Sequence, residues 1–91
     1  PELLYLLGAS RAGLGNHKGA VKMLEKAVKL APDLIVAQRD LAISYARMGS
    51  TAEAQAMLAQ LQAKASACGA SCDANAELSA AVAQVQAAMP V

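Results

Sequence analysis

The chain has 91 residues, of which 56% are hydrophobic and only 2% aromatic, and its formal net charge is +1. This length suffices for one small domain, and so small a net charge argues against a general attraction to nucleic acid or an acidic membrane. The apolar residues are mostly Ala and Leu, which favour helices, and runs of β-branched residues, the usual strand signal, are absent. We therefore predict an all-α domain.

The first two predicted helices are separated by a short turn. Leucines at helical spacing predict a helix over residues 2–14, which Gly15 ends because glycine suits the left-handed backbone after a helix. Asn16 is well placed to cap a second helix over residues 17–30. Pro32 ends that helix, since the residue before a proline avoids helical backbone angles.

The next two helices are predicted over residues 34–48 and 51–65. Asp33 is a good cap for the earlier one, and Ser50 with Glu53 fits a capping box at the start of the later one. Apolar residues at helical spacing give each of these helices one buried stripe. The four helices together predict two successive helical hairpins.

A segment of small residues then breaks the helical pattern, and a fifth helix is predicted over residues 73–88. The break contains Cys68 and Cys72, the two cysteines of the chain. A pair of cysteines in one turn favours a structural disulfide that ties the last helix to the fourth. An oxidised pair would favour a periplasmic or secreted setting, and reduced thiols a cytoplasmic one.

Reduced thiols, a thiol redox role and half of a metal site are the alternatives for this cysteine pair. Zinc normally takes four ligands, and the single histidine, His17, is distant in the sequence, so the metal site is disfavoured. We interpret His17 as an exposed turn residue, because no acid or nucleophile partner is spaced to act with it. We expect no catalytic residues, no cofactor and no metal.

Identical residues recur 34 positions apart along the chain. The pairs are Leu7 and Leu41, Gly15 and Gly49, Ala20 and Ala54, and Leu24 and Leu58. Small residues such as Gly8, Ala20 and Ala42 let paired helices approach closely, and large ones such as Leu24 and Tyr45 fill the gaps. This helix–turn–helix pattern, which covers residues 1–66, resembles the tetratricopeptide repeat.

The resemblance implies a right-handed α-solenoid of antiparallel helix hairpins with five helices. Residues 1–34 form the first repeat, residues 35–68 the second, and residues 69–91 a turn and a capping helix. The chain departs from the family pattern at Arg11, where an aromatic residue is usual, and at Gln38, where a large apolar residue is usual. Because the chain begins at Pro1 rather than Met, we expect it to be part of a longer or processed protein.

In this family the first helix of each pair lines a concave groove that holds peptides or protein segments. Carried over position by position, this surface would include Glu2, Tyr5, Ala9, Ala12, Val36, Arg39, Ile43 and Arg47. Of these, the residues expected to bind a partner are Tyr5, Ala9, Arg39, Ile43 and Arg47. Tyrosine and arginine are favoured interface anchors, and two arginines eight residues apart could meet an acidic segment. In the alternative interpretation, the arginines are simply solvated and Asp40 is a nearby partner.

The resemblance thus implies a non-catalytic module that binds another protein, with a thiol-based role of the cysteine pair as the alternative. Nucleic acid is not an expected partner, because the lysine row from Lys18 to Lys29 has no aromatic residues for base stacking. No apolar run approaches the ~18 residues that a membrane-spanning helix needs.

The first helix carries more apolar surface than one neighbouring helix would cover. Its leucines are Leu3, Leu4, Leu6 and Leu7. The end helices of a repeat array usually need a polar outer face. We therefore expect either an upstream repeat or a homodimer to cover this surface.

Overall fold

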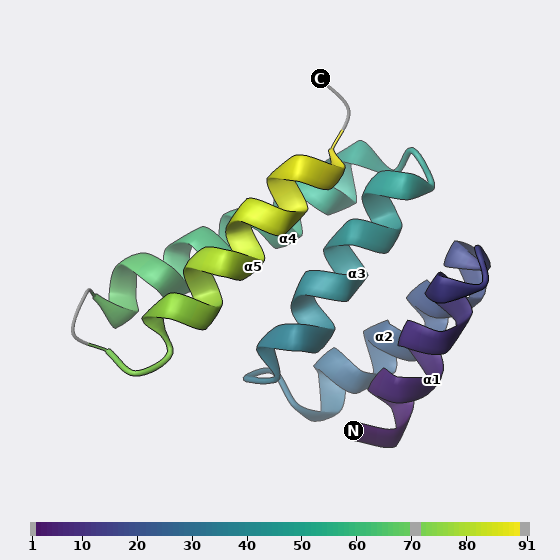
Figure 1. The fold of residues 1–91 in the computed structure, drawn as a ribbon, viewed down its shortest axis with the longest axis horizontal. Coiled ribbons are helices and arrows are strands. Elements are labelled where there is room, and N and C mark those ends of the chain that lie inside the picture. The colour runs from purple at the N-terminus through teal and green to yellow at the C-terminus, as the bar shows by residue number, and fades with distance from the viewer. Residues whose placement is uncertain (1, 70–71, 90–91) are drawn as a thin grey trace.

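A computed structural model describes residues 2–69 and 72–89, and these residues form five α-helices (Figure 1). The helices are α1 (Glu2–Gly13), α2 (His17–Leu30), α3 (Ile35–Arg47), α4 (Thr51–Cys68) and α5 (Asn75–Ala88). The all-α prediction is confirmed. None of these helices is long and apolar enough to cross a membrane.

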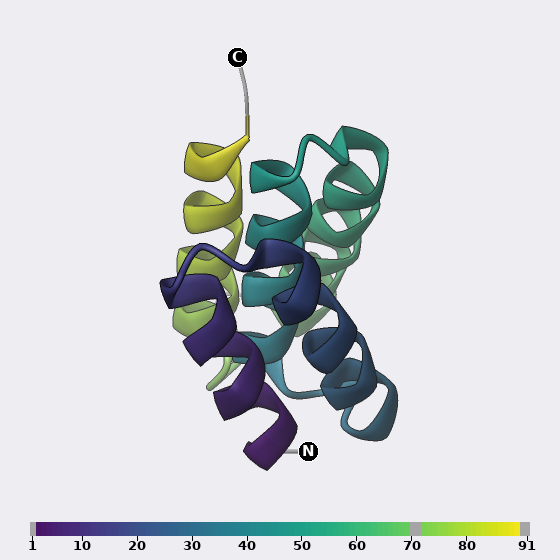
Figure 2. The same ribbon diagram turned by 90° about the vertical axis from the view of Figure 1, so that its right-hand side faces the viewer.

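The helices lie in two layers. α1, α3 and α5 form the front layer in Figure 1, and α2 and α4 form the layer behind it, as the turned view in Figure 2 also shows. Within the stack, α1 packs against α2, α3 packs against α2 and α4, and α5 packs against α3 and α4. α1 and α3 touch each other only slightly. The front layer is therefore open between these two helices.

The core is built by α2, α3, α4 and α5. Its buried residues are Ala20, Val21, Leu24, Leu41, Ala42, Met57, Leu61, Leu78, Ala81 and Val85. α1 adds only partly buried side chains, Tyr5 and Ala12, to the edge of this cluster. Val85 of α5 is fully buried, so the last helix completes the core rather than merely covering it.

The α1–α2 turn and the α3–α4 turn resemble each other in backbone conformation as well as in sequence. Gly15 and Gly49 have φ angles of 83° and 82°, a left-handed conformation that L-residues rarely adopt. The Asn16 cap is confirmed, because its Oδ1 accepts a hydrogen bond from the Gly19 backbone N–H at 3.0 Å. The same local geometry thus ends α1 and α3.

The predicted cap at Asp33 is wrong, and Ser50 occupies its predicted cap position without the predicted side-chain hydrogen bond. α3 begins one residue later than expected, with Leu34 at its cap position, because the backbone N–H of Leu34 donates to the Ala31 carbonyl and closes a turn that contains Asp33. Ser50 precedes α4, but its side chain makes no capping hydrogen bond. Neither of these helix starts therefore has a side-chain cap.

The fourth helix continues to Cys68, three residues beyond its predicted end. Leu61, Ala65 and Cys68 follow one another at helical spacing and all contact the core cluster. The composition of this segment suggested a break, but the buried stripe continues through it. Gly69, with a φ of 77°, ends the helix.

The joint between the two hairpins is held from two sides. The Pro32 carbonyl accepts hydrogen bonds from Lys64 Nζ at 2.8 Å and from Gln38 Nε2. Gln38 is only 2% exposed, and its Oε1 has no hydrogen-bond partner in the structure. At a position where the family usually has a large apolar residue, Gln38 thus shares the carbonyl of the turn with Lys64.

Candidate protein-binding groove

A groove with a cavity of about 240 Å³ lies between α1 and α3. Its lining residues are Ala9, Ala12, Gly13, His17, Asp40, Ile43, Ser44 and Arg47. Two helices from neighbouring hairpins supply its walls, and the first residue of α2 closes one end. We refer to this feature as the groove.

The α1 wall is made of small residues. Ala12 and Gly13 lie three and four positions after Ala9, so both are neighbours of Ala9 on the helix surface. None of them carries a side chain longer than a methyl group, which leaves the helix backbone accessible. A bound chain could therefore approach α1 closely on this side.

The α3 wall carries longer side chains and combines apolar with polar and charged groups. Asp40, Ile43, Ser44 and Arg47 again occupy one helix face, with a carboxylate at one end and a guanidinium at the other. Ile43 is half-buried between them and offers apolar contact. This wall can therefore supply both an apolar contact and charged hydrogen-bonding groups.

The structure brings three of the five predicted groove residues together. Ala9, Ile43 and Arg47 line the groove, whereas Tyr5 and Arg39 precede Ala9 and Ile43 by one helical turn and do not line its cavity. These two lie beside Asp40, which is itself a lining residue of the groove. The structure thus locates all five residues without testing whether they bind a partner.

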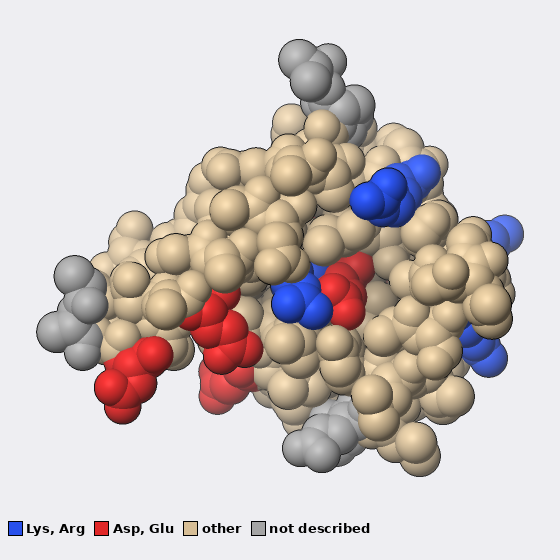
Figure 3. All heavy atoms as spheres, viewed as in Figure 1, with Lys and Arg blue, Asp and Glu red and all other residues tan. Residues whose placement is uncertain are grey.

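The charges at this end of the groove are already partly engaged. Arg39 Nε donates to Asp40 Oδ1 at 2.9 Å, and this bond raises the pKa of Arg39. Burial, and next the nearby Asp40 carboxylate, raise the pKa of Tyr5. Figure 3 shows a basic and an acidic group side by side at the centre of this face.

Arg47 differs from Arg39 in its surroundings. It is exposed at the end of α3, and no ion pair engages it among the described residues. An exposed guanidinium on the rim of a groove can offer two parallel hydrogen bonds to a carboxylate. Of the two predicted arginines, Arg47 is therefore the one available to a ligand.

Comparison with known families assigns the fold. A tetratricopeptide repeat family model matches residues 12–89. The chain belongs to the tetratricopeptide repeat family. The match includes α5, which lies beyond the 1–66 span of the predicted resemblance. No curated protein and no solved structure matches the chain.

Membership in the tetratricopeptide repeat family sets the class of function. Such repeats generally mediate protein–protein interaction and are typically non-catalytic. The described residues contain no group of three or more His, Cys, Asp or Glu side chains that could hold a metal ion.

Sequence reasoning missed several lining residues of the groove. Asp40 and Ser44 lie on the same helix face as Arg47, so helical phase alone could have found them. His17 was interpreted as an exposed turn residue, but it is half-buried, lines the groove, and has a buried Nδ1 without a hydrogen-bond partner. Its position depends on the path of the α1–α2 turn, which no local pattern reveals.

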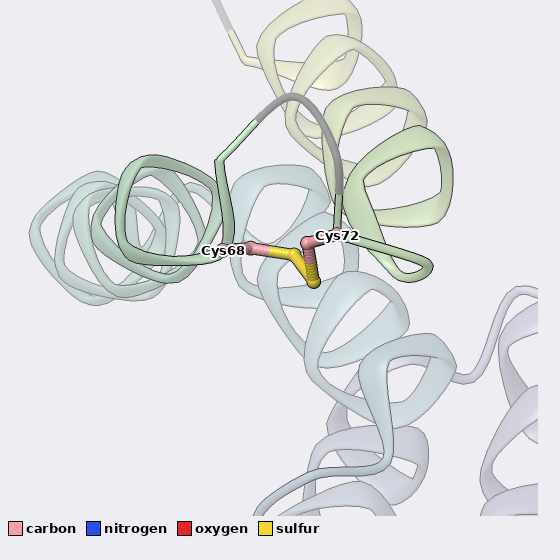
Figure 4. Close-up of a disulfide and its surroundings, with 2 residues drawn as sticks. All are labelled: Cys68 and Cys72. Atoms are coloured by element: carbon pink, nitrogen blue, oxygen red, sulfur yellow. A yellow bond between two sulfur atoms is a disulfide. The ribbon is translucent and has the colours of Figure 1, made fainter.

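The cysteine pair lies away from the groove, at the joint between α4 and α5. The Cα atoms of Cys68 and Cys72 are 5.2 Å apart, and their sulfur atoms are joined as a disulfide (Figure 4). The bond connects the end of α4 to the segment that leads into α5. The oxidised state in solution stays a prediction.

Proposed function

We propose that this domain binds a segment of another protein in the groove between α1 and α3, without catalysing a reaction on it. The observation that supports the proposal is a cavity of about 240 Å³ with one wall of small residues and one wall of apolar and charged residues. Pockets that combine apolar surface with a few convergent polar groups are the usual form of a binding site.

The lining suggests how a segment would lie. The backbone of the segment would pass over Ala9, Ala12 and Gly13, and an apolar side chain would rest on Ile43. An acidic side chain would reach Arg47, and a hydrogen-bond donor would face Asp40. The preference for an acidic segment therefore depends on Arg47, because Arg39 is paired with Asp40.

A charge reversal tests this arrangement. Proteins recovered by the unmodified domain in a pull-down are identified first, and their recovery is then measured with Arg47→Glu and with Arg39→Glu/Arg47→Glu. We expect recovery to fall at least about fivefold with either, since a hot-spot residue contributes more than about 1 kcal/mol. Lys26→Glu, on the exposed side of α2, is the matched control and should leave recovery unchanged.

A steric variant separates the groove from the charge. Ala9→Leu would place a larger side chain in the cavity without altering any charge, and should weaken the same partner. Unchanged recovery with both Ala9→Leu and Arg47→Glu would remove the groove from the binding surface.

We further propose that a second copy of the chain covers the outer face of α1. Leu3 and Leu6 are 70% and 59% exposed, and Leu7 on the same helix is 44% exposed. Burying such side chains stabilises an interface by about 25 cal/mol per Å² of apolar surface.

Sedimentation velocity should show a dimer that Leu3→Glu/Leu6→Glu disrupts, whereas Leu14→Glu, in the following turn, leaves it intact. A monomer at high concentration would contradict this assignment.

The proposed role of the cysteine pair is structural. A Cα separation of 5.2 Å lies within the range that disulfides require, and the bond would join the last helix to the rest of the array. Mass measured after alkylation without reductant tests this, because full labelling of both thiols would exclude the disulfide. A thiol redox role would instead require turnover of a dithiol substrate that is lost in Cys68→Ser.

A further inference from the structure

A second cavity lies at the joint where the α2–α3 turn meets the start of α5, and we call it the corner pocket. It has a volume of about 330 Å³ and is lined by Asp33, Ile35, Lys64, Ala74 and Leu78. These residues come from the α2–α3 turn, the start of α3, the end of α4 and the start of α5. No residue lines both this pocket and the groove, so the corner pocket is a separate feature.

The floor of the corner pocket is apolar. Leu78 is 4% exposed and belongs to the core cluster, and Ile35 and Ala74 pack against that cluster. An aliphatic chain that entered the pocket would be removed from water against these side chains, which is favourable in proportion to the area buried. The floor therefore favours a ligand with a hydrocarbon portion.

The rim of the corner pocket is acidic. Asp33 lines it, and two further carboxylates, Asp73 and Glu77, are the sequence neighbours of the lining residues Ala74 and Leu78. All three carboxylates are exposed, and no ion pair engages any of them in residues 2–69 and 72–89. Figure 3 shows acidic groups gathered at this corner, below the start of α5.

The lysine in the lining does not cancel this charge. Lys64 Nζ donates to the Pro32 carbonyl at 2.8 Å, which directs its ammonium group toward the joint of the two hairpins. The lining itself carries one carboxylate and one ammonium, and Asp73 and Glu77, next to lining residues in the sequence, add two negative charges at this corner. The potential at the rim therefore favours a cation.

We propose that the corner pocket receives a lysine or arginine side chain from a segment of a partner protein. The long aliphatic stem of such a side chain packs on Ile35 and Leu78, and its charged end lies at the rim beside Asp33. Lysine and arginine commonly bury their stems along apolar surface while their charged ends stay near water and carboxylates. The assignment does not depend on the groove, because the two cavities share no residue.

The test uses a defined probe and nuclear magnetic resonance. A short capped peptide with one lysine between leucines is titrated into the labelled chain, and the same peptide with an acetylated lysine is the control. We expect the lysine peptide to shift the amide signals of Asp33, Ile35 and Ala74, and the shifts to weaken at high salt because of screening. The acetylated peptide keeps the stem but lacks the charge, so it should bind more weakly.

Two variants locate the charge that matters. Asp33→Asn should weaken binding about two- to fivefold, the scale of one exposed ion pair. Asp33 lies in a turn and caps no helix, so the substitution should not disturb the fold. Glu53→Gln removes an exposed carboxylate eleven positions before Lys64 on α4, roughly 16 Å away, and should have no effect.

Several outcomes would overturn the proposal. These are no shift at the corner pocket, equal binding of the acetylated peptide, or shifts confined to groove residues such as Ile43. Shifts at the corner pocket that grow with protein concentration alone would assign it to a second copy of the chain, and would equally overturn its assignment to a partner segment.

Discussion

The contact between Gly8 of α1 and Leu24 of α2 allows a sharp test of how the first hairpin is packed. A methyl group placed on Gly8 would lie 2.6 Å from Leu24 Cγ and 2.9 Å from its Cδ2, which is closer than carbon atoms can approach. Leu24 is fully buried in the core, so it cannot move aside without disturbing its neighbours. We therefore expect Gly8→Ala to destabilise the protein.

The magnitude follows from two opposing effects. Overpacking a well-packed core costs about 1–3 kcal/mol, whereas replacing glycine by alanine inside a helix gains up to about 1 kcal/mol. The net loss in the free energy of unfolding should reach about 2 kcal/mol. Urea unfolding followed by far-ultraviolet circular dichroism measures it, through the midpoint at a constant slope.

Gly13→Ala is the matched control, because it makes the same change in the same helix. No atom lies within 4 Å of a methyl group at Gly13. The change there should be neutral or stabilise the protein by a few tenths of a kcal/mol, since Gly13 is the last residue of the helix. If Gly8→Ala proved as stable as Gly13→Ala, the close approach of α1 and α2 would be refuted.

A double-mutant cycle identifies the partner of the clash. Leu24→Ala alone should cost about 3–5 kcal/mol, because it leaves a cavity in the core. In Gly8→Ala/Leu24→Ala the new methyl group occupies part of that cavity, so the combined loss should be smaller than the sum by about 1–3 kcal/mol. Additive losses would mean that the strain in Gly8→Ala arises elsewhere.

Three further predictions concern the cysteine pair, a tyrosine and a buried glutamine. The disulfide between Cys68 and Cys72, with a sequence separation of 4, would close a short loop, so its reduction should lower the free energy of unfolding by only about 2 kcal/mol. Urea unfolding with and without reductant measures this loss. Identical midpoints would show that the thiols are already free. The pKa of Tyr5 is raised above its ordinary value of 10.0, so its contribution to stability is complete below pH 10.0 and is lost as the pH rises through the folded value. Thermal melts of Tyr5→Phe should therefore fall less steeply above pH 10.0 than those of the unmodified chain. Gln38→Met should leave the free energy of unfolding unchanged or raise it by up to about 1 kcal/mol. The change removes an unpartnered buried oxygen, and Lys64 still donates to the Pro32 carbonyl. A large loss of stability in urea unfolding would show that the Gln38 hydrogen bond contributes more than the unpartnered oxygen costs.

The sequence by itself determined the class of the fold and the unit from which it is built. Residues repeated at 34-position intervals identified the hairpin, and Gly15 and Asn16 marked a turn whose left-handed backbone and cap the structure confirms. These features are local, so a sequence pattern carries them directly. The resemblance to the tetratricopeptide repeat, carried over position by position, implied that Ala9, Ile43 and Arg47 face the groove.

Only the tertiary structure decided where the cavities lie. α1 touches α3 only slightly, whereas α5 packs against α3. The groove therefore opens between α1 and α3, as a consequence of core packing that no single helix encodes. The corner pocket likewise joins Asp33 to Leu78, 45 positions away, where a turn meets the ends of three helices. The end of α4 at Cys68 was misjudged for the same reason: contact with the core extends that helix through a segment whose composition favours a break.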